Sequence, residues 1–136
     1  MPLRPLPLLL AACALAAPVA ACGSDASDGR DQDAVQQTVE RFVSAFAGGH
    51  DAEACRLLSD DAKDALGAPS SCPAGIAALR AMLPTAQRDR LGDAQVESVE
   101  VAGDRATVRL SAFIDSDGRP TRLRRVDGRW LIQPEG

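Results

Sequence analysis

The spacing of apolar residues changes along this chain from a helical repeat to strict alternation, and the change falls near residue 93. Between residues 33 and 91, apolar residues recur three or four positions apart, which indicates helices with one buried face. After residue 95 they alternate with polar residues, most strictly at Ala106, Val108, Leu110, Ala112 and Ile114. Helices followed by strands predict an α+β fold, with N-terminal helices packed on a curved, antiparallel, four-stranded sheet.

The first half of the chain predicts three helices and a short helical turn. The first helix spans residues 33–47, and Gly48-Gly49 ends it. Asp51 is the expected N-cap of the second helix, which breaks in two near Asp60-Asp61. The third helix has Pro73 in its first turn, Ser71 or Cys72 as its cap and Pro84 as its stop. Its apolar face comprises Ile76, Leu79, Met82 and Leu83, and a helical turn follows it up to Leu91.

The second half predicts four strands joined by tight turns. The first strand, residues 95–102, shifts the parity of its valines, which indicates a β-bulge. Gly103-Asp104 and Asp127-Gly128 are expected to form hairpin turns, and residues 115–118 form the turn between them. The remaining strands are expected over residues 106–114, 121–126 and 129–133.

An apolar N-terminal run ends in Val19-Ala20-Ala21-Cys22 and opens onto a polar stretch. This tetrapeptide resembles the lipobox of bacterial lipoproteins. The resemblance implies that residues 1–21 are a signal peptide, that cleavage falls between Ala21 and Cys22, and that the Cys22 thiol carries the lipid. Cys13 ends a second match, and an ordinary secreted or membrane-spanning segment is a further alternative. The apolar run is short and holds several prolines, which disfavours a permanent span.

A lipid-anchored chain would lie on the extracytoplasmic face of the cell membrane. Residues 22–32 then hold the lipidated cysteine and a flexible tether rich in Gly, Ser and Asp. Loss of the leader removes Arg4 and changes the formal charge from −4 to −5. An acidic chain is not expected to bind nucleic acid. The expected partners are membrane lipid, through Cys22, and an envelope protein or a small ligand.

Two cysteines, Cys55 and Cys72, remain after the lipidation site. Outside the cytoplasm, such a pair is most simply a disulfide. It would contribute about 3 kcal/mol by closing its loop. A metal pair or a reactive thiol is the alternative, but the chain has one histidine and no C-x-x-C spacing.

The order of elements over residues 33–134 resembles the nuclear transport factor 2-like superfamily. The resemblance lies in VQQTVERFVSAFAGGHDAEACRLL, where a helix, a Gly-rich break and Asp51 lead into a second helix, and in the closing VDGRWLI. It implies a cone-shaped domain with a pocket at its open end, where enzymatic members place Asp, His or Tyr. This chain has no tyrosine, and its one histidine, His50, lies between helices. We therefore expect no catalytic residue and no cofactor.

Two short acidic segments suggest metal sites, and each has a simpler interpretation. His50, Asp51 and Glu53 are spaced poorly for converging on a metal, and a helix-capping loop is favoured. Residues 115–118 begin like a calcium loop but lack its later ligands, so a hairpin turn is favoured. No metal is expected.

A basic cluster and one tryptophan near the C-terminus are the remaining candidates. If Arg122 and Arg124 share a sheet face, they would receive an anionic ligand or an acidic partner, and the alternative is a solvated face that offsets acidic helices. The cluster comprises Arg119, Arg122, Arg124, Arg125 and Arg129. Trp130 either lines the pocket of the cone or packs in the core near Phe42 and Phe46.

These observations favour a non-catalytic domain that binds a partner or a small ligand at the cell surface. One alternative is a small enzyme of the isomerase, cyclase or hydrolase type that uses the cone pocket. Another is an accessory subunit that docks on a larger envelope complex through its sheet.

Overall fold

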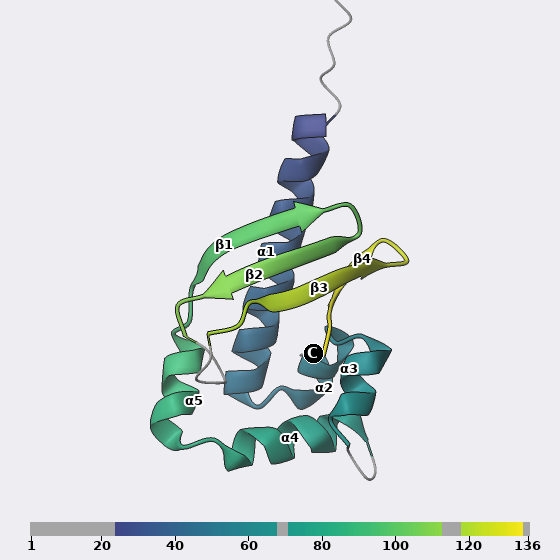
Figure 1. Ribbon diagram of the computed structural model, residues 1–136. Helices are drawn as coiled ribbons and strands as arrows, with labels where there is room; N and C mark the ends of the chain where they lie inside the picture. The colour runs from purple at the N-terminus through teal and green to yellow at the C-terminus, as the bar shows by residue number, and fades with distance from the viewer. Residues whose placement is uncertain (1–23, 68–70, 113–117, 135–136) are drawn as a thin grey trace, which may run out of the picture.

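The computed structural model describes residues 24–67, 71–112 and 118–134, and within them it is an α+β domain. Five helices precede four strands: α1 (Ser24–Gly48), α2 (Asp51–Arg56), α3 (Asp60–Ala65), α4 (Cys72–Met82), α5 (Thr85–Gly92), β1 (Val96–Ala102), β2 (Arg105–Leu110), β3 (Thr121–Val126) and β4 (Arg129–Ile132). The strands form an open antiparallel sheet in the order β1-β2-β3-β4. The predicted fold class is thereby confirmed: helices pack on a four-stranded antiparallel sheet (Figure 1).

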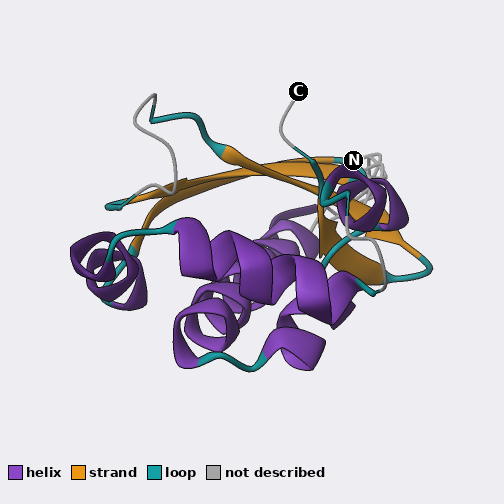
Figure 2. Ribbon diagram, turned by 90° about the horizontal axis from the view of Figure 1, so that it is seen from below, coloured by secondary structure: helices purple, strands orange, loops and turns teal. Residues whose placement is uncertain are grey.

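The sheet has an inner face against the helices and an outer face that the helical layer leaves uncovered (Figure 2). Inner positions alternate along β2 and β3, where Ala106, Val108, Leu110 and Leu123 are buried. Helix α1 crosses this face (Figure 1) and contributes residues at helical spacing, of which Val35, Val39 and Phe46 are at most 1% exposed. The apolar residues at helical spacing and those that alternate along the strands are therefore buried in the same core.

Two hairpin turns and a bulge were predicted correctly. Asp127 and Gly128 both have positive φ, 49° and 75°, as a type I′ turn requires. Gly103 has a φ of 64° and links β1 to β2 through the other two-residue turn. The register of β1 shifts between Val96 and Ser98, where the valine parity changes.

The break after α2 connects the helices to the last strand. The backbone N–H of Ile132 donates to the carbonyl of Leu57 (2.9 Å), and the N–H of Ser59 donates to the carbonyl of Ile132 (2.8 Å). Leu58 and Ile132 thus form a parallel bridge. Ser59 then caps α3 by accepting from the N–H of Ala62. The predicted break is present, but Ser59 begins the new helix and Asp60-Asp61 lie inside it.

The predicted flexible tether over residues 22–32 is wrong from Ser24 onward, because α1 begins there. Figure 1 shows this polar extension projecting beyond the sheet. Asp31 accepts two hydrogen bonds from Arg125, 94 residues later in the chain. The Gly, Ser and Asp content of this stretch gave no sign of that partner.

Three smaller expectations differ from the structure. His50, and not Asp51, occupies the N-cap of α2, and no side chain caps that helix. Met82 is 80% exposed, because it is the last residue of α4 and the chain turns away at Leu83 and Pro84. Strand β2 ends at Leu110. Beyond it Ala112 is outside the strand, and Ile114 is outside the described residues.

Candidate functional site

The predicted lipidation site is outside the described residues. This applies to Ala21 and Cys22, and also to the alternative Cys13. Most of the suspected calcium loop, residues 115–117, is outside them as well. Within the described part of the chain, no helix is long and apolar enough to cross a bilayer.

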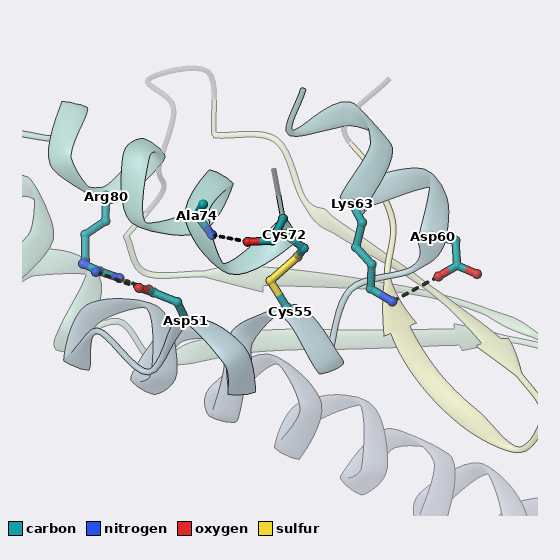
Figure 3. The surroundings of a disulfide bond; sticks show 8 residues. Asp51, Cys55, Asp60, Lys63, Cys72, Ala74 and Arg80 are labelled. Atoms are coloured by element: carbon teal, nitrogen blue, oxygen red, sulfur yellow. Dashed lines mark hydrogen bonds and ion pairs between the residues drawn. A yellow bond between two sulfur atoms is a disulfide. The ribbon is translucent and has the colours of Figure 1, made fainter. Parts of the chain in front are cut away.

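Cys55 of α2 and Cys72 of α4 are joined by a disulfide, with their Cα atoms 6.0 Å apart (Figure 3). Ser71 precedes the second cysteine and caps α4 by accepting from the N–H of Ala74 (3.4 Å). Cys55 is buried in the core cluster, and Cys72 packs against that cluster. The bond therefore staples the two helices at the edge of the core and leaves no thiol there for chemistry.

The suspected metal residues have other partners. Asp51 forms a two-bond ion pair with the guanidinium of Arg80 (Figure 3). The same guanidinium also donates to the carbonyl of Phe46. Glu53 pairs with Arg41 at 3.0 Å. Among the described residues, no group of three His, Cys, Asp or Glu side chains is placed to hold a metal ion. The segment after α1 is therefore a structural junction between α1, α2 and α4.

The Arg80 guanidinium lowers the pKa of Asp51 by its hydrogen bonds, against the opposing effect of burial. The same contact raises the pKa of Arg80. A carboxyl whose pKa is lower in the folded protein stabilises the fold above its unfolded pKa, near 4, and loses that contribution as the pH falls.

We expect Asp51→Asn to lower the free energy of unfolding by about 2 kcal/mol at pH 7, because it removes a charged hydrogen-bond pair whose side chains are about 20% exposed. The gap between the variant and the wild type should shrink below about pH 4, where Asp51 becomes protonated in the unfolded chain. Urea denaturation at several pH values measures this. A gap that is constant down to pH 2 would contradict the ion-pair account. Asp64→Asn, which removes an exposed carboxylate from α3, is the control.

Trp130 lies in the core. It is 5% exposed and belongs to the same cluster as Phe46. The guanidinium of Arg125 lies 5.1 Å from its ring centre and bonds Asp31 of α1 at 2.8 and 2.9 Å. Arg125 also donates to the carbonyl of Gly103 (3.2 Å). This residue therefore joins α1, both hairpins and the tryptophan.

Arg125→Gln should lower the free energy of unfolding by about 1 kcal/mol, since both ion-pair side chains are partly exposed and solvent screens them. It should also speed amide hydrogen exchange in α1 near Asp31. Arg109→Gln is the matched control, because no ion pair holds that arginine in the described part of the chain, and it should change stability by less than about 0.5 kcal/mol. Equal effects of the two variants would refute the role of Arg125.

Arginines gather on the outer face of the sheet, on the two central strands. Arg105 of β2 lies directly opposite Arg124 of β3, and Thr107 lies opposite Arg122. Arg109 follows on β2 with the same parity. All four arginines are exposed. We call Arg105, Arg109, Arg122 and Arg124 the arginine track.

A hollow of about 350 Å³ lies beside three of the four arginines of the track. Its charged lining is Arg105, Arg122, Arg124 and, from α3, Asp61. The uncharged lining is Ala106, Thr107, Leu123, Gln133 and Pro134. Arg122 donates to the carbonyl of Pro134 (3.1 Å), which orients its guanidinium. The expected sharing of one face by Arg122 and Arg124 is therefore observed, and Trp130 is not part of this site.

The remaining residues of the site were not predicted from the sequence. Arg105, Thr107 and Arg109 alternate with the buried Ala106, Val108 and Leu110, so the strand pattern already placed them on the outer face. What the sequence did not give was the register between β2 and β3, which sets Arg105 opposite Arg124. The approach of Asp61 from α3 had no sequence signal.

The site suits binding and offers little to catalysis. Guanidinium groups stay protonated in proteins, so the arginines donate hydrogen bonds and positive charge but accept no proton. Asp61 is the one carboxylate that lines the hollow among the described residues. It has no histidine, cysteine or second carboxylate beside it in that lining. An anion is therefore the natural occupant.

Comparisons with protein-family models, with curated proteins and with solved structures give no match to this chain.

Proposed function

We propose that this protein is a lipid-anchored domain of the cell envelope that binds an anionic ligand or partner on the outer face of its sheet and performs no chemistry. The observation that carries the proposal is the pairing of Arg105 with Arg124 across β2 and β3. The two arginines are exposed and opposite each other on the central strands.

Like charges placed directly opposite each other destabilise a sheet. The ion pair between Arg124 and Asp104 offsets this repulsion only weakly. The two groups are 3.9 Å apart, and the side chains of Arg124 and Asp104 are both more than half exposed. No ion pair holds Arg105 in the described part of the chain. A bound anion between the two guanidiniums would convert this repulsion into two charge-assisted contacts.

The anchor is proposed from the lipobox-like segment before α1. Cys22→Ala should release the protein from the membrane fraction or leave its leader uncleaved, and a membrane fractionation with intact-mass analysis distinguishes these results. Cys13→Ala is the control and should leave the anchoring unchanged. Membrane retention of Cys22→Ala with a lipid still attached would refute the proposed site.

We also infer that the domain belongs to the nuclear transport factor 2-like superfamily. The support is the helix, Gly-rich break and helix at residues 35–58, followed by a meander that ends in β4. An experimental structure superposed on members of that superfamily tests the inference, and a sheet that does not curve around α1 would contradict it.

Anion binding is tested with tripolyphosphate, a small multivalent anion, titrated into the purified protein in a calorimeter. Replacing both Arg105 and Arg124 with Gln should weaken binding roughly tenfold, because two charged contacts are lost. The same change should leave the stability unchanged or slightly raised, since it relieves the like-charge pair. Replacing both Arg30 of α1 and Arg90 of α5 with Gln, at two exposed positions, removes equal charge elsewhere and is the control. No binding, or equal weakening in both variants, would refute the site.

A further inference from the structure

The arginine track is longer than one small anion. Arg105 and Arg109 are four residues apart on β2, and a strand rises about 3.3 Å per residue, so their Cα atoms are roughly 13 Å apart. Arg122 and Arg124 run beside them on β3. When an anionic group is held between Arg105 and Arg124, Arg109 can therefore contact a second anionic group of the same ligand.

Acidic side chains border the track on both sides. Glu100 of β1 lies opposite Thr107 and is exposed, on the same face of the sheet. Asp61 of α3 lines the other side of the hollow. A broad anionic surface pressed against the sheet would meet both carboxylates, whereas a slender chain fits between them. The charge pattern thus favours a narrow polymer over an anionic bilayer.

The uncharged polar groups along the track suit a ligand with hydroxyl groups. Thr107 offers a hydroxyl and Gln133 an amide, and the Asp61 carboxylate accepts hydrogen bonds. No hydrogen bond or ion pair occupies that carboxylate within the described residues. Apolar side chains also stand on this face, because Val126 follows Arg124 by two positions and is 40% exposed, and Leu131 of β4 lies opposite Arg124. Neither lines the hollow, where Thr107, Gln133 and the Asp61 carboxylate supply the hydrogen-bonding groups that a hydroxylated ligand would use.

We propose that the arginine track binds a linear, hydroxyl-rich anionic polymer, made of sugar or polyol units that carry carboxylate or phosphate groups. Successive anionic groups contact the Arg105–Arg124 pair and then Arg109, while ligand hydroxyls bond Thr107 and Asp61. This inference rests on the proposed anion-binding function and names the class of ligand.

The test uses the lipidated full-length protein in neutral detergent micelles and linear galacturonate chains of one to six units, each unit carrying one carboxylate. Affinity should rise with chain length, because longer chains reach more arginines. Arg109→Gln should weaken the binding of the hexamer roughly threefold and leave that of the monomer unchanged. Replacing both Arg105 and Arg124 with Gln should weaken both. Salt should weaken the hexamer more steeply than the monomer.

The outcomes separate the two proposals. If tripolyphosphate and the galacturonate monomer bind, and chain length and Arg109→Gln have no effect, the polymer is refuted and the anion site stands. If no anion binds, both are refuted. Equal affinity for polyglutamate of matched length would overturn the preference for hydroxyl groups. Displacement of the hexamer by anionic phospholipid added to the micelles would show that the face binds lipid, and would overturn the polymer proposal.

Discussion

Replacing both Cys55 and Cys72 with alanine is expected to lower the free energy of unfolding by about 3 kcal/mol. The disulfide closes a loop between residues 17 positions apart, and the chain-entropy relation gives about 3 kcal/mol for a loop of that size. The bond joins α2 to α4 at the edge of the core, so its removal also frees the segment that contains α3. The melting temperature should fall by about 10 °C or more.

Urea denaturation of the oxidised protein, the reduced protein and the double variant measures this effect. The reduced protein and the double variant should agree closely, because both release the same loop in the unfolded chain. Ser71→Ala, which removes the neighbouring cap and keeps the disulfide, is the control and should cost about 1 kcal/mol. If the oxidised and reduced proteins unfold at the same urea concentration, the disulfide does not stabilise the domain.

Phe46→Ala is expected to lower the free energy of unfolding by about 4 kcal/mol, the usual cost of emptying a fully buried phenylalanine site. Phe46 is 0% exposed and lies in the last turns of α1, where the helix meets the core. The chain has only three phenylalanines and one tryptophan, so no other large side chain is available to fill the space. A small domain has a total stability of about 5–15 kcal/mol, which makes this loss severe.

Phe42→Ala provides the matched control, because Phe42 is only half-buried and its ring packs against Phe46 with centroids 6.1 Å apart. It should cost about half as much. Thermal unfolding followed by near-ultraviolet circular dichroism reports on Trp130, which lies in the same cluster. Equal losses in the two variants would contradict the assigned difference in burial.

Sequence reasoning succeeded where the structure depends on neighbours in the chain. The strict alternation around Val108 placed β2 and its buried face, and Asp127-Gly128 fixed the last hairpin through backbone conformations that few residues adopt. The valine parity located the bulge in β1. In each case the physical cause operates within a few residues, so the pattern contains it.

Sequence reasoning failed where the structure depends on distant partners. Residues 24–32 have the composition of a linker, but Arg125 holds Asp31 in α1 from the far end of the chain. Asp51 has the chemistry of an N-cap, but the guanidinium of Arg80 takes its carboxylate. The candidate site predicted from the sequence was incomplete for the same reason. Arg105 belongs to the site only because it lies opposite Arg124 on the neighbouring strand.

The bridge between Leu58 and Ile132 has a consequence for the kinetics of folding. It joins the helical half to the last strand across more than 70 residues, and Arg125 spans 94 residues to reach α1. Contacts so distant in sequence slow folding, because the chain must close large loops before the contacts repay the lost entropy. A chain that leaves the ribosome or crosses a membrane N-terminus first would complete its core only after residues 129–132 emerge. Until then its inner sheet positions stay open to other chains, so a longer time in transit should raise the risk of aggregation.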